Sequence, residues 1–421
     1  MSKIFQAVKG MPDIIGTQAA QWRRVEQMAF ALFAKAHFLE MRTPVLEDLH
    51  LFERGIGTST DIVEKEMYTL VDRNERALAL RPEGTAPIVR AYLEHFNKRE
   101  GSAEKRLCYF GPMFRYERPQ KGRFRQFYQF GAEILGVDDP TVDAELIQLI
   151  VQLLEKLAVQ DYQLLINSLG TPEVRQKYKS KLLNYLDQVE SQLCEKCQSR
   201  KIKNPLRVLD CKTQSCVDLL KQAPSLLDDL DDISKSHFDR LQNYLSIAGI
   251  PYQVNPQLVR GLDYYDKTAF EFTSTKLGAQ NAFAGGGRYN NLVQELGGPA
   301  IPAVGFALGM ERLMDLVGQN VFPQTPNLLI LIALGEEANK FFFKHFCELR
   351  NEVKLSVMLE GSERSLKAKL KMADRQEARY VLILGEQELQ AGLMVLKDMK
   401  AGTQQELSLQ NWINQIKLLI P

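Results

Sequence analysis

The sequence after residue 326 alternates between apolar and amphipathic segments, and this pattern constrains the fold more than any other feature. Short apolar segments predict strands, and the segments between them have helical periodicity. Such alternation is typical of a small α/β domain with a largely parallel sheet. Strands are predicted at 328–334, 353–359 and 380–384, and helices at 336–350, 362–375 and 412–419.

The residues before this alternation have a different pattern. Helices are predicted near 17–37 and 140–158, and between them and after them lie short strands typical of an antiparallel sheet. Helical, lysine-rich stretches replace the strand pattern between residues 172 and 249, and Gln324-Thr325-Pro326 predicts a linker. We therefore predict an α+β domain from residues 1–171 and 250–322, a helical insertion domain at 172–249, and an α/β domain at 327–421. The strands of the first domain are predicted at 67–71, 77–80, 106–110, 124–135, 256–272, 282–287 and 303–308.

Composition and charge exclude several classes of protein. The 421 residues are 45% hydrophobic and 25% charged with a net charge of +1, so nothing drives the whole chain toward nucleic acid or membranes, although local basic patches could bind RNA. The N-terminus has no signal-peptide pattern, and no apolar run is long enough to span a bilayer. Six cysteines do not indicate a disulfide scaffold, so a cytoplasmic protein without a membrane partner is expected. HExxH, GxSxG and GxxxxGK[ST] motifs are missing, which argues against zincins, serine hydrolases and P-loop enzymes.

Five segments are candidates for chemistry. Residues 260–265 (Arg-Gly-Leu-Asp-Tyr-Tyr) lie beside a predicted strand and indicate either a site or a surface turn with an ion pair. Residues 81–85 (Arg-Pro-Glu-Gly-Thr) suit an ammonium group or form a turn before a helix. Residues 114–133 read as two strands with a cationic loop, whose arginines suit phosphate and whose phenylalanines suit a base. Residues 284–289 and 305–312 contain glycines that let the backbone approach a ligand closely.

Together these segments resemble the histidyl-tRNA synthetases, a family of class II aminoacyl-tRNA synthetases, over essentially the full length of the chain. Phe114-Arg115-Tyr116-Glu117 with Phe127 resembles motif 2 of that class, and residues 309–312 resemble motif 3. The region around Pro44 resembles motif 1, which implies a homodimer. Residues 260–265 and 285–289 resemble the two histidine-specific motifs. Asn290-Asn291 departs from the Asp-Gly common at this position, which puts the shape of that loop in doubt.

The resemblance implies a reaction in which L-histidine is activated with ATP and transferred to tRNA-His, with Mg²⁺ bound beside the phosphates. Arg260 and Arg115 would be catalytic. The implied ATP-binding residues are Arg115, Glu117, Arg123, Phe127 and Arg312. The implied histidine-binding residues are Glu83, Thr85, Gln129, Glu133, Tyr264 and Tyr265.

The resemblance also implies contacts with tRNA. Arg118 and Gln120 match the position that reads the extra 5′ guanosine of tRNA-His, and the α/β domain would bind the anticodon. A charged helix carries Arg364, Lys367, Lys369, Lys371 and Arg375, which form either an anticodon-side patch or a solvated face. The alternative function is a non-catalytic paralogue that regulates ATP phosphoribosyltransferase. This alternative is disfavoured because such paralogues lack the anticodon domain and typically lose catalytic residues.

Four cysteines within the insertion form the last candidate site. Cys194 and Cys197 make a CxxC pair, and Cys211 and Cys216 follow at a spacing compatible with a four-thiolate zinc site. The second pair is wider than a usual zinc knuckle, and the insertion has enough apolar residues to fold unaided. We therefore expect four reduced cysteines without a metal, with zinc as the alternative.

Overall fold

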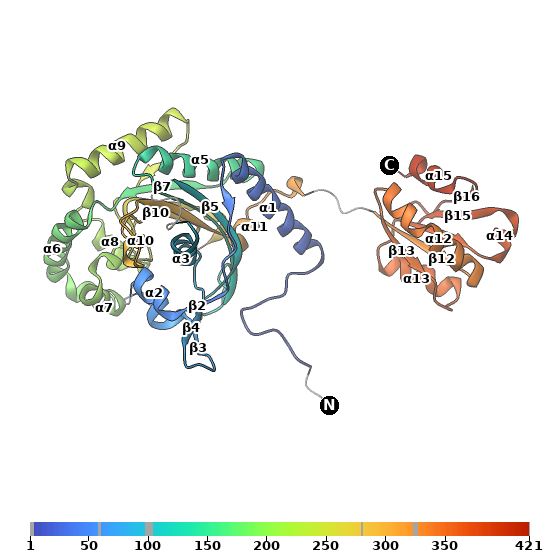
Figure 1. Ribbon diagram of the computed structural model, residues 1–421, viewed down its shortest axis with the longest axis horizontal. Helices are drawn as coiled ribbons and strands as arrows, with labels where there is room; N and C mark the ends of the chain where they lie inside the picture. The colour runs from blue at the N-terminus through green and yellow to red at the C-terminus, as the bar shows by residue number, and fades with distance from the viewer. Residues whose placement is uncertain (1–3, 58–59, 97–103, 279–280, 323–326, 421) are drawn as a thin grey trace. The chain divides into compact units, whose positions relative to one another are not determined.

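The computed structural model describes residues 4–57, 60–96, 104–278, 281–322 and 327–420. The chain divides into two compact units, Met1–Phe322 and Pro323–Pro421 (Figure 1). The predicted linker Gln324-Thr325-Pro326 lies outside the described residues.

A largely antiparallel sheet forms the centre of the first unit. Its strand order is β1-β5-β6-β11-β10-β9-β7-β8, and within it the outer pairs β1/β5 and β7/β8 are parallel. The predicted antiparallel sheet is thus confirmed. The strands are β1 (Leu39–Glu40), β5 (Lys105–Phe114), β6 (Gln126–Leu135), β7 (Gln163–Ser168), β8 (Gln253–Val254), β9 (Asp266–Thr273), β10 (Ala282–Arg288) and β11 (Ala303–Gly309). A smaller sheet has the order β2 (Leu46–Asp48), β4 (Ala77–Leu80), β3 (Tyr68–Val71).

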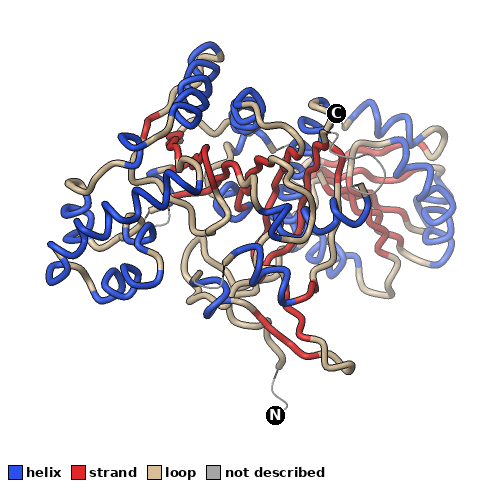
Figure 2. The backbone as a smooth tube through the Cα atoms, turned by 60° about the vertical axis from the view of Figure 1, so that its left-hand side comes forward, coloured by secondary structure: helices blue, strands red, loops and turns tan. Residues whose placement is uncertain are grey.

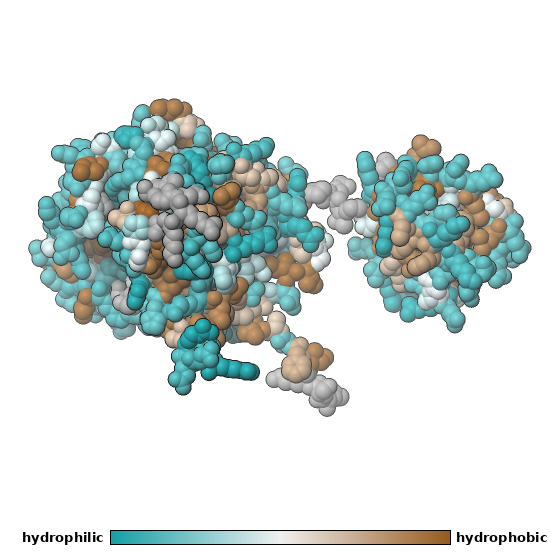
Figure 3. Space-filling model, in the orientation of Figure 1, coloured by the Kyte–Doolittle hydropathy of each residue, from teal (hydrophilic) through white to brown (hydrophobic). Residues whose placement is uncertain are grey.

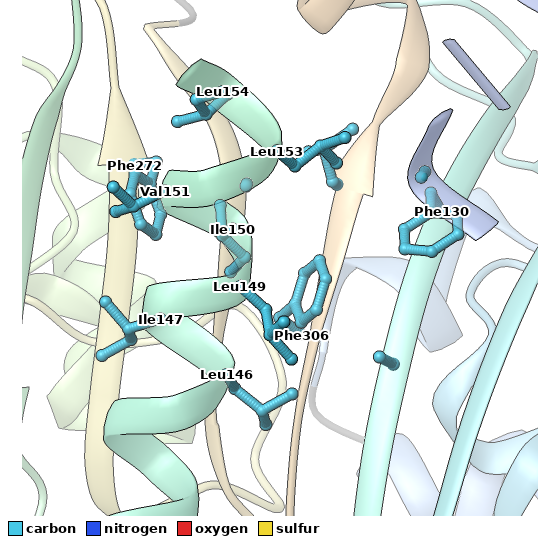
Figure 4. Close-up of a cluster of buried hydrophobic side chains, with 14 of the residues drawn as sticks. Phe130, Leu146, Ile147, Leu149, Ile150, Val151, Leu153, Leu154, Phe272 and Phe306 are labelled. Carbon is cyan, nitrogen blue, oxygen red and sulfur yellow. The ribbon is translucent and has the colours of Figure 1, made fainter. Parts of the chain in front are cut away.

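One face of the large sheet packs against helices α1 (Gly16–Lys35), α5 (Pro140–Lys156) and α9 (Asp232–Ile247). Helix α5 begins after Asp139, whose side chain accepts a hydrogen bond from the backbone N–H of Thr141, and Pro140 occupies its first turn. Its apolar side chains point toward Phe306 and Phe272 of the sheet (Figure 4). Each fully buried side chain of this size contributes about 1.5–3 kcal/mol to folding. On the opposite face, a second apolar cluster that includes Ile88, Val89 and Tyr92 covers part of the same strands. The part of that face outside this cluster is left for a site.

One predicted strand of this unit is partly wrong. A strand was expected at 256–272, but β9 begins at Asp266 and residues 256–265 form a loop. The Asn167 side-chain amide donates hydrogen bonds to the carbonyls of Pro256 (3.3 Å) and Leu258 (2.9 Å). Because these carbonyls bond to a side chain, the loop is held without a neighbouring strand.

Residues 172–249, all of them described, contain helices and no strand, as the sequence predicts. Helices α6 (Pro172–Gln188), α7 (Glu195–Lys203) and α8 (Gln214–Leu220) lie together at one end of the first unit (Figure 1). The last helix of this segment, α9, instead packs Phe238, Leu241 and Leu245 into the core beside α5. Further α-helices among the described residues of the first unit are α2 (Leu49–Ile56), α3 (Thr85–His95), α10 (Leu292–Glu295) and α11 (Met310–Met314).

The second unit has a sheet of order β13-β12-β14-β15-β16. Figure 2 colours the strands of the molecule red and its helices blue. Strands β12 (Leu328–Ala333), β13 (Ser356–Glu360) and β14 (Tyr380–Leu384) are parallel, whereas β15 (Leu393–Asp398) and β16 (Gln404–Ser408) are antiparallel. The predicted α/β domain is confirmed, but its sheet is mixed. The β16 strand is mostly exposed and polar, so it carries no apolar pattern for the sequence to reveal. The helices are α12 (Glu336–Glu352), α13 (Leu366–Arg375), α14 (Glu386–Ala391) and α15 (Trp412–Leu419).

Among the described residues, every helix is too short or too polar to cross a membrane. Hydrophilic side chains cover most of the face shown in Figure 3.

Candidate active site

A cavity of about 230 Å³ lies in the first unit, on the face of the sheet opposite α5. Strand alternation explains this placement. Phe130 of β6 and Phe306 of β11 point into the helix-covered core, whereas Phe127, Gln129 and Ala307 line the cavity. Of the residues predicted for the site, the cavity is lined by Glu83, Thr85, Arg115, Glu117, Arg123, Phe127, Gln129, Arg260, Tyr264, Tyr265 and Arg312.

Arg260 is held in this cavity by several contacts. Its Nη1 donates to Glu271 Oε2 at 3.0 Å, and its guanidinium lies 5.5 Å from the centre of the Tyr265 ring. A Cβ atom at position 285 would lie 2.4 Å from Arg260 Nη1, so only glycine at 285 leaves room for this guanidinium. Within the described part of the chain, the buried Arg260 Nε has no hydrogen-bond partner. A donor oriented in this way is available to an anionic ligand.

For residues 81–85 the sequence left two interpretations open, a segment that binds an ammonium group or a turn before a helix. Glu83 and Thr85 have features of both. The Glu83 carboxylate accepts hydrogen bonds from the backbone N–H groups of Thr85 (2.7 Å) and Ala86 (2.8 Å), so residues 81–85 do form a turn that begins helix α3. Both side chains also line the cavity. Burial raises the pKa of Glu83, while the backbone hydrogen bonds from Ala86 and Thr85 oppose the shift.

Three more guanidinium groups face the same cavity. Arg115 donates from Nε to the Pro82 carbonyl (2.9 Å) and lies 5.2 Å from the centre of the Phe127 ring. Arg123 pairs with Glu117 at 3.0 Å. Arg312 donates from Nε to the Gly122 carbonyl (2.9 Å). Burial, and after it repulsion from Arg123 as the second cause, lower the pKa of Arg312. So many cations in one cavity attract an anion with several charges, such as a chain of phosphates.

Glu133 lies below the cavity rather than on its wall. It is fully buried and accepts hydrogen bonds from Tyr289 Oη (2.5 Å), Thr85 Oγ1 (2.8 Å) and Tyr109 Oη (3.4 Å). Burial raises the pKa of Glu133 to about 8, although the hydrogen bonds from Tyr289 and Thr85 lower it. A Cβ atom at position 305 would lie 1.5 Å from Glu133 Oε2, so Gly305 makes the space for this carboxyl.

Two carboxylates that line the cavity were not predicted from the sequence as site residues. Glu271 lines the cavity and pairs with Arg260. Glu311 also lines it, and its Oε1 accepts a hydrogen bond from the Tyr128 backbone N–H at 3.0 Å. Burial raises the pKa of Glu311 to about 7. Both had a signal in the sequence, because Glu271 interrupts an apolar strand and Glu311 precedes Arg312.

Other predicted residues lie elsewhere. Arg118 and Gln120 are exposed and do not line the cavity.

On α13 and the loop before it, Arg364, Lys367, Lys371 and Arg375 are exposed, but the inclusion of Lys369 in a surface patch is wrong. The Lys369 side chain is buried and donates from Nζ to the carbonyls of Ala333 (2.5 Å) and Glu360 (3.3 Å).

Arg288, within the second histidine-like motif, is also outside the cavity. Its guanidinium is fully buried and pairs with the Asp143 carboxylate at 2.5 Å. Its Nη1 also donates to the Val137 carbonyl at 2.9 Å. Arg288 therefore ties β10 to the start of α5.

Comparisons with known proteins agree with this architecture. The family profile described as histidyl-tRNA synthetase matches residues 10–313, and that of an anticodon binding domain matches residues 329–419. With the antiparallel sheet and the cavity of arginines, these matches define a class II aminoacyl-tRNA synthetase. The histidine–tRNA ligase of Desulfitobacterium hafniense is 47% identical over 412 residues, which cover 97% of this chain and 96% of that protein. The chain belongs to the histidyl-tRNA synthetase family.

Further relatives support the same assignment. The histidine–tRNA ligase of a Cyanothece species is 47% identical over 420 residues, covering 100% of this chain and 97% of that protein. The crystal structure of apo histidyl-tRNA synthetase from S. aureus superposes with a TM-score of 0.79 at 32% identity, covering 98% of this chain and 100% of that one. A structure described as an ATP phosphoribosyltransferase regulatory subunit/histidyl-tRNA synthetase from Bacillus halodurans has a TM-score of 0.66 at 19% identity over 91% of this chain and 99% of that one. This last similarity shows the shared fold alone.

Proposed function

We propose that this chain is a histidine–tRNA ligase, which forms histidyl-adenylate from histidine and ATP and transfers the histidyl group to the 3′ end of tRNA-His. The observation that carries the proposal is the placement of Arg260. Its Nε, which has no hydrogen-bond partner among the described residues, shares one cavity with the cations Arg115 and Arg312 and with Glu83 and Thr85. The cavity thus combines groups that suit phosphates with groups that suit an amino acid.

The first step is an in-line displacement at phosphorus. The histidine carboxylate attacks the α-phosphorus of ATP, the bond to the β-phosphate oxygen breaks, and pyrophosphate leaves. Such a step depends on alignment and on cations near the developing charge, and it needs no side-chain nucleophile. In the proposal, Arg260 bridges the histidine carboxylate and the α-phosphate, and Arg115 holds the same phosphate. In the second step a ribose hydroxyl of the tRNA attacks the activated carbonyl, and AMP leaves.

The proposed ATP site uses the remaining cations and the aromatic ring beside them. Phe127 stacks on one face of the adenine ring, and Arg312 covers the other face. Glu117 accepts a hydrogen bond from the adenine amino group. Arg312 also holds the phosphate farthest from the adenine, and Arg123 lies nearby. Support comes from the Arg115–Phe127 contact, which brings a phosphate-binding group next to a stacking surface. Glu271 and Glu311 would hold Mg²⁺, because carboxylate oxygens suit this hard cation, and the ion would supply positive charge to the phosphates.

The proposed histidine site lies between α3 and the loop at 260–265. Glu83, Thr85 and Gln129 hold the α-amino group, and the buried Gln129 Oε1, which has no partner within the described residues, supports this role. Glu133, Tyr264 and Tyr265 read the imidazole. Amino acids that lack a ring N–H cannot donate to this carboxyl, so they lose this contact and bind less well.

The proposed partners are tRNA-His and a second copy of the chain. The exposed Arg118 and Gln120 contact the 5′ end of the tRNA, and the exposed cations of α13 face the anticodon arm. The strands around Pro44 expose Leu39, Leu46 and Val71, which supports a homodimer interface at that edge. The proposed location is the cytoplasm.

The regulatory paralogue is the weaker candidate. Residues 329–419 match an anticodon binding domain, and Arg115, Arg260 and Arg312 all line the cavity. A non-catalytic subunit would need none of these groups.

An ATP–pyrophosphate exchange assay across the twenty amino acids tests the proposal. We expect exchange with histidine alone, and a loss of about 100- to 1000-fold in Arg260→Ala, as for removal of one preoriented donor. Exchange with another amino acid, or activity of Arg260→Ala within about threefold of wild type, would overturn it.

A further inference from the structure

We propose that Cys194, Cys197, Cys211 and Cys216 bind one structural zinc ion through four thiolates. Their sulfur atoms all lie within 4.8 Å of one another, although 22 residues separate the first from the last. With Zn–S bonds of about 2.3 Å, the sulfurs of a tetrahedral site are about 3.8 Å apart. The Cys194 and Cys211 sulfurs are 3.9 Å apart, whereas a disulfide would require about 2.05 Å. The arrangement therefore fits a metal better than the metal-free thiols expected from the sequence.

The local backbone also suits thiolate ligands. Cys194 precedes α7 and Cys197 lies in its first turn, as in a zinc knuckle. The backbone N–H of Cys194 donates to Cys216 Sγ (3.2 Å), and that of Thr213 donates to Cys211 Sγ (3.4 Å). Such N–H groups stabilise negative charge on sulfur. The wide second spacing causes no difficulty, because helix α8 brings Cys216 back to the cluster.

Four protein ligands leave no open position on zinc, so the site has a structural role rather than a catalytic one. It joins α7 and α8 to the segment between them, which reaches the active-site loop. In that segment, Arg207 Nη2 donates to the Gly261 carbonyl (2.5 Å), and Asn204 Nδ2 donates to Asp263 Oδ1 (3.0 Å). Both contacted residues follow Arg260 closely in its loop. The zinc ion thus fixes the part of the insertion that supports Arg260.

Metal content tests the site without reference to activity. Full-length protein without an affinity tag, purified without chelators, should contain one zinc per chain by elemental analysis. Cys197→Ser should retain less than about a tenth of it, because each thiol must lose its proton and bind for the metal to stay. Cys347→Ser is the matched control, since Cys347 is exposed on α12, and it should keep its zinc. Metal-free wild type with four free thiols or with disulfides, or full zinc in Cys197→Ser, would overturn the proposal.

A second measurement avoids variants that fail to fold. Titration of the wild-type protein with an organic mercurial should release one zinc per chain as the thiols react, and hydrogen exchange should then increase at residues 194–216 and at 260–265. Zinc release without reaction of these cysteines would overturn the site, and unchanged exchange at 260–265 would overturn the link to Arg260. This link to catalysis rests on the proposed function, whereas the metal content does not.

Discussion

Replacing Gly285 by alanine should disable Arg260 without unfolding the protein. The added methyl carbon would lie 2.4 Å from Arg260 Nη1 and 2.7 Å from its Cζ. Since non-bonded carbon atoms prefer separations of about 3.5–4.0 Å, the guanidinium must move by about 1 Å. A displacement of this size can reduce the rate of an aligned reaction by about 100-fold. The stability should change little, because the atom that must move is the end of a flexible side chain.

The assay is histidine-dependent ATP–pyrophosphate exchange, accompanied by thermal unfolding of each variant. Gly261→Ala is the matched control, because Gly261 is exposed and a Cβ atom there would meet no atom within 4 Å. Its activity should stay within about threefold of wild type. A double-mutant cycle tests the mechanism: in the Arg260→Ala background, Gly285→Ala should add less than about threefold, because both changes remove one interaction. Activity of Gly285→Ala near the wild-type level, or a further 100-fold loss in the Arg260→Ala background, would refute the reasoning.

Four further predictions concern specificity, the pH dependence of stability, the second unit and the buried ion pair. Measured above pH 8, where Glu133 is ionised, Glu133→Gln should raise KM for histidine at least about tenfold and leave KM for ATP within twofold, since a charge-assisted hydrogen bond is lost; equal effects on both would remove Glu133 from the histidine site. Because burial raises the pKa of Glu133 to about 8, wild-type stability relative to Glu133→Gln should be greatest below pH 4.5 and should fall as pH rises through 8, and a flat difference in denaturant titrations would contradict this. Residues 1–324 should retain histidine-dependent exchange but charge tRNA poorly, and full charging would show that the second unit does not contribute. Arg288→Ala leaves the buried Asp143 carboxylate with only the longer contact to His237 Nε2 (3.4 Å) and should cost about 3–5 kcal/mol in denaturant titrations. Arg240→Ala, which removes an exposed pair, should cost much less, and similar losses would contradict the structural role of Arg288.

The sequence revealed the elements that carry a periodic pattern. Strand β6 is a clear case, because strand alternation puts Phe130 on one face and Phe127 and Gln129 on the other. The structure places Phe130 in the core and the other two at the cavity. Patterns failed where polar side chains decided the backbone. The loop at 256–265 reads as a strand, but Asn167, which is distant in sequence, binds its carbonyls. Lys369 has the spacing of a surface lysine, yet two backbone carbonyls bind its ammonium group inside the second unit.

The site could be predicted as a set of residues but not as an arrangement. The motifs contained most of the side chains that line the cavity, because those residues lie close together in sequence within each motif. They did not indicate that Glu271 would hold Arg260, since the contact crosses from a loop to a strand. Nor did they show that Arg288 would turn away from the cavity to meet Asp143, 145 residues earlier in the chain.

The glycines of the site act by making room for large polar side chains. The run at 285–287 suggested a backbone that approaches a ligand, but Gly285 faces the Arg260 guanidinium, as Gly305 faces the Glu133 carboxyl. A polar group packed against bare backbone has few alternative positions, so its geometry is set before the ligand arrives, which is what electrostatic catalysis requires. Arg260 is then restricted on several sides: by Glu271, by the space at Gly285, and by the insertion through Arg207. It follows that the insertion, which contributes no residue to the cavity wall, still determines how well the cavity is organised.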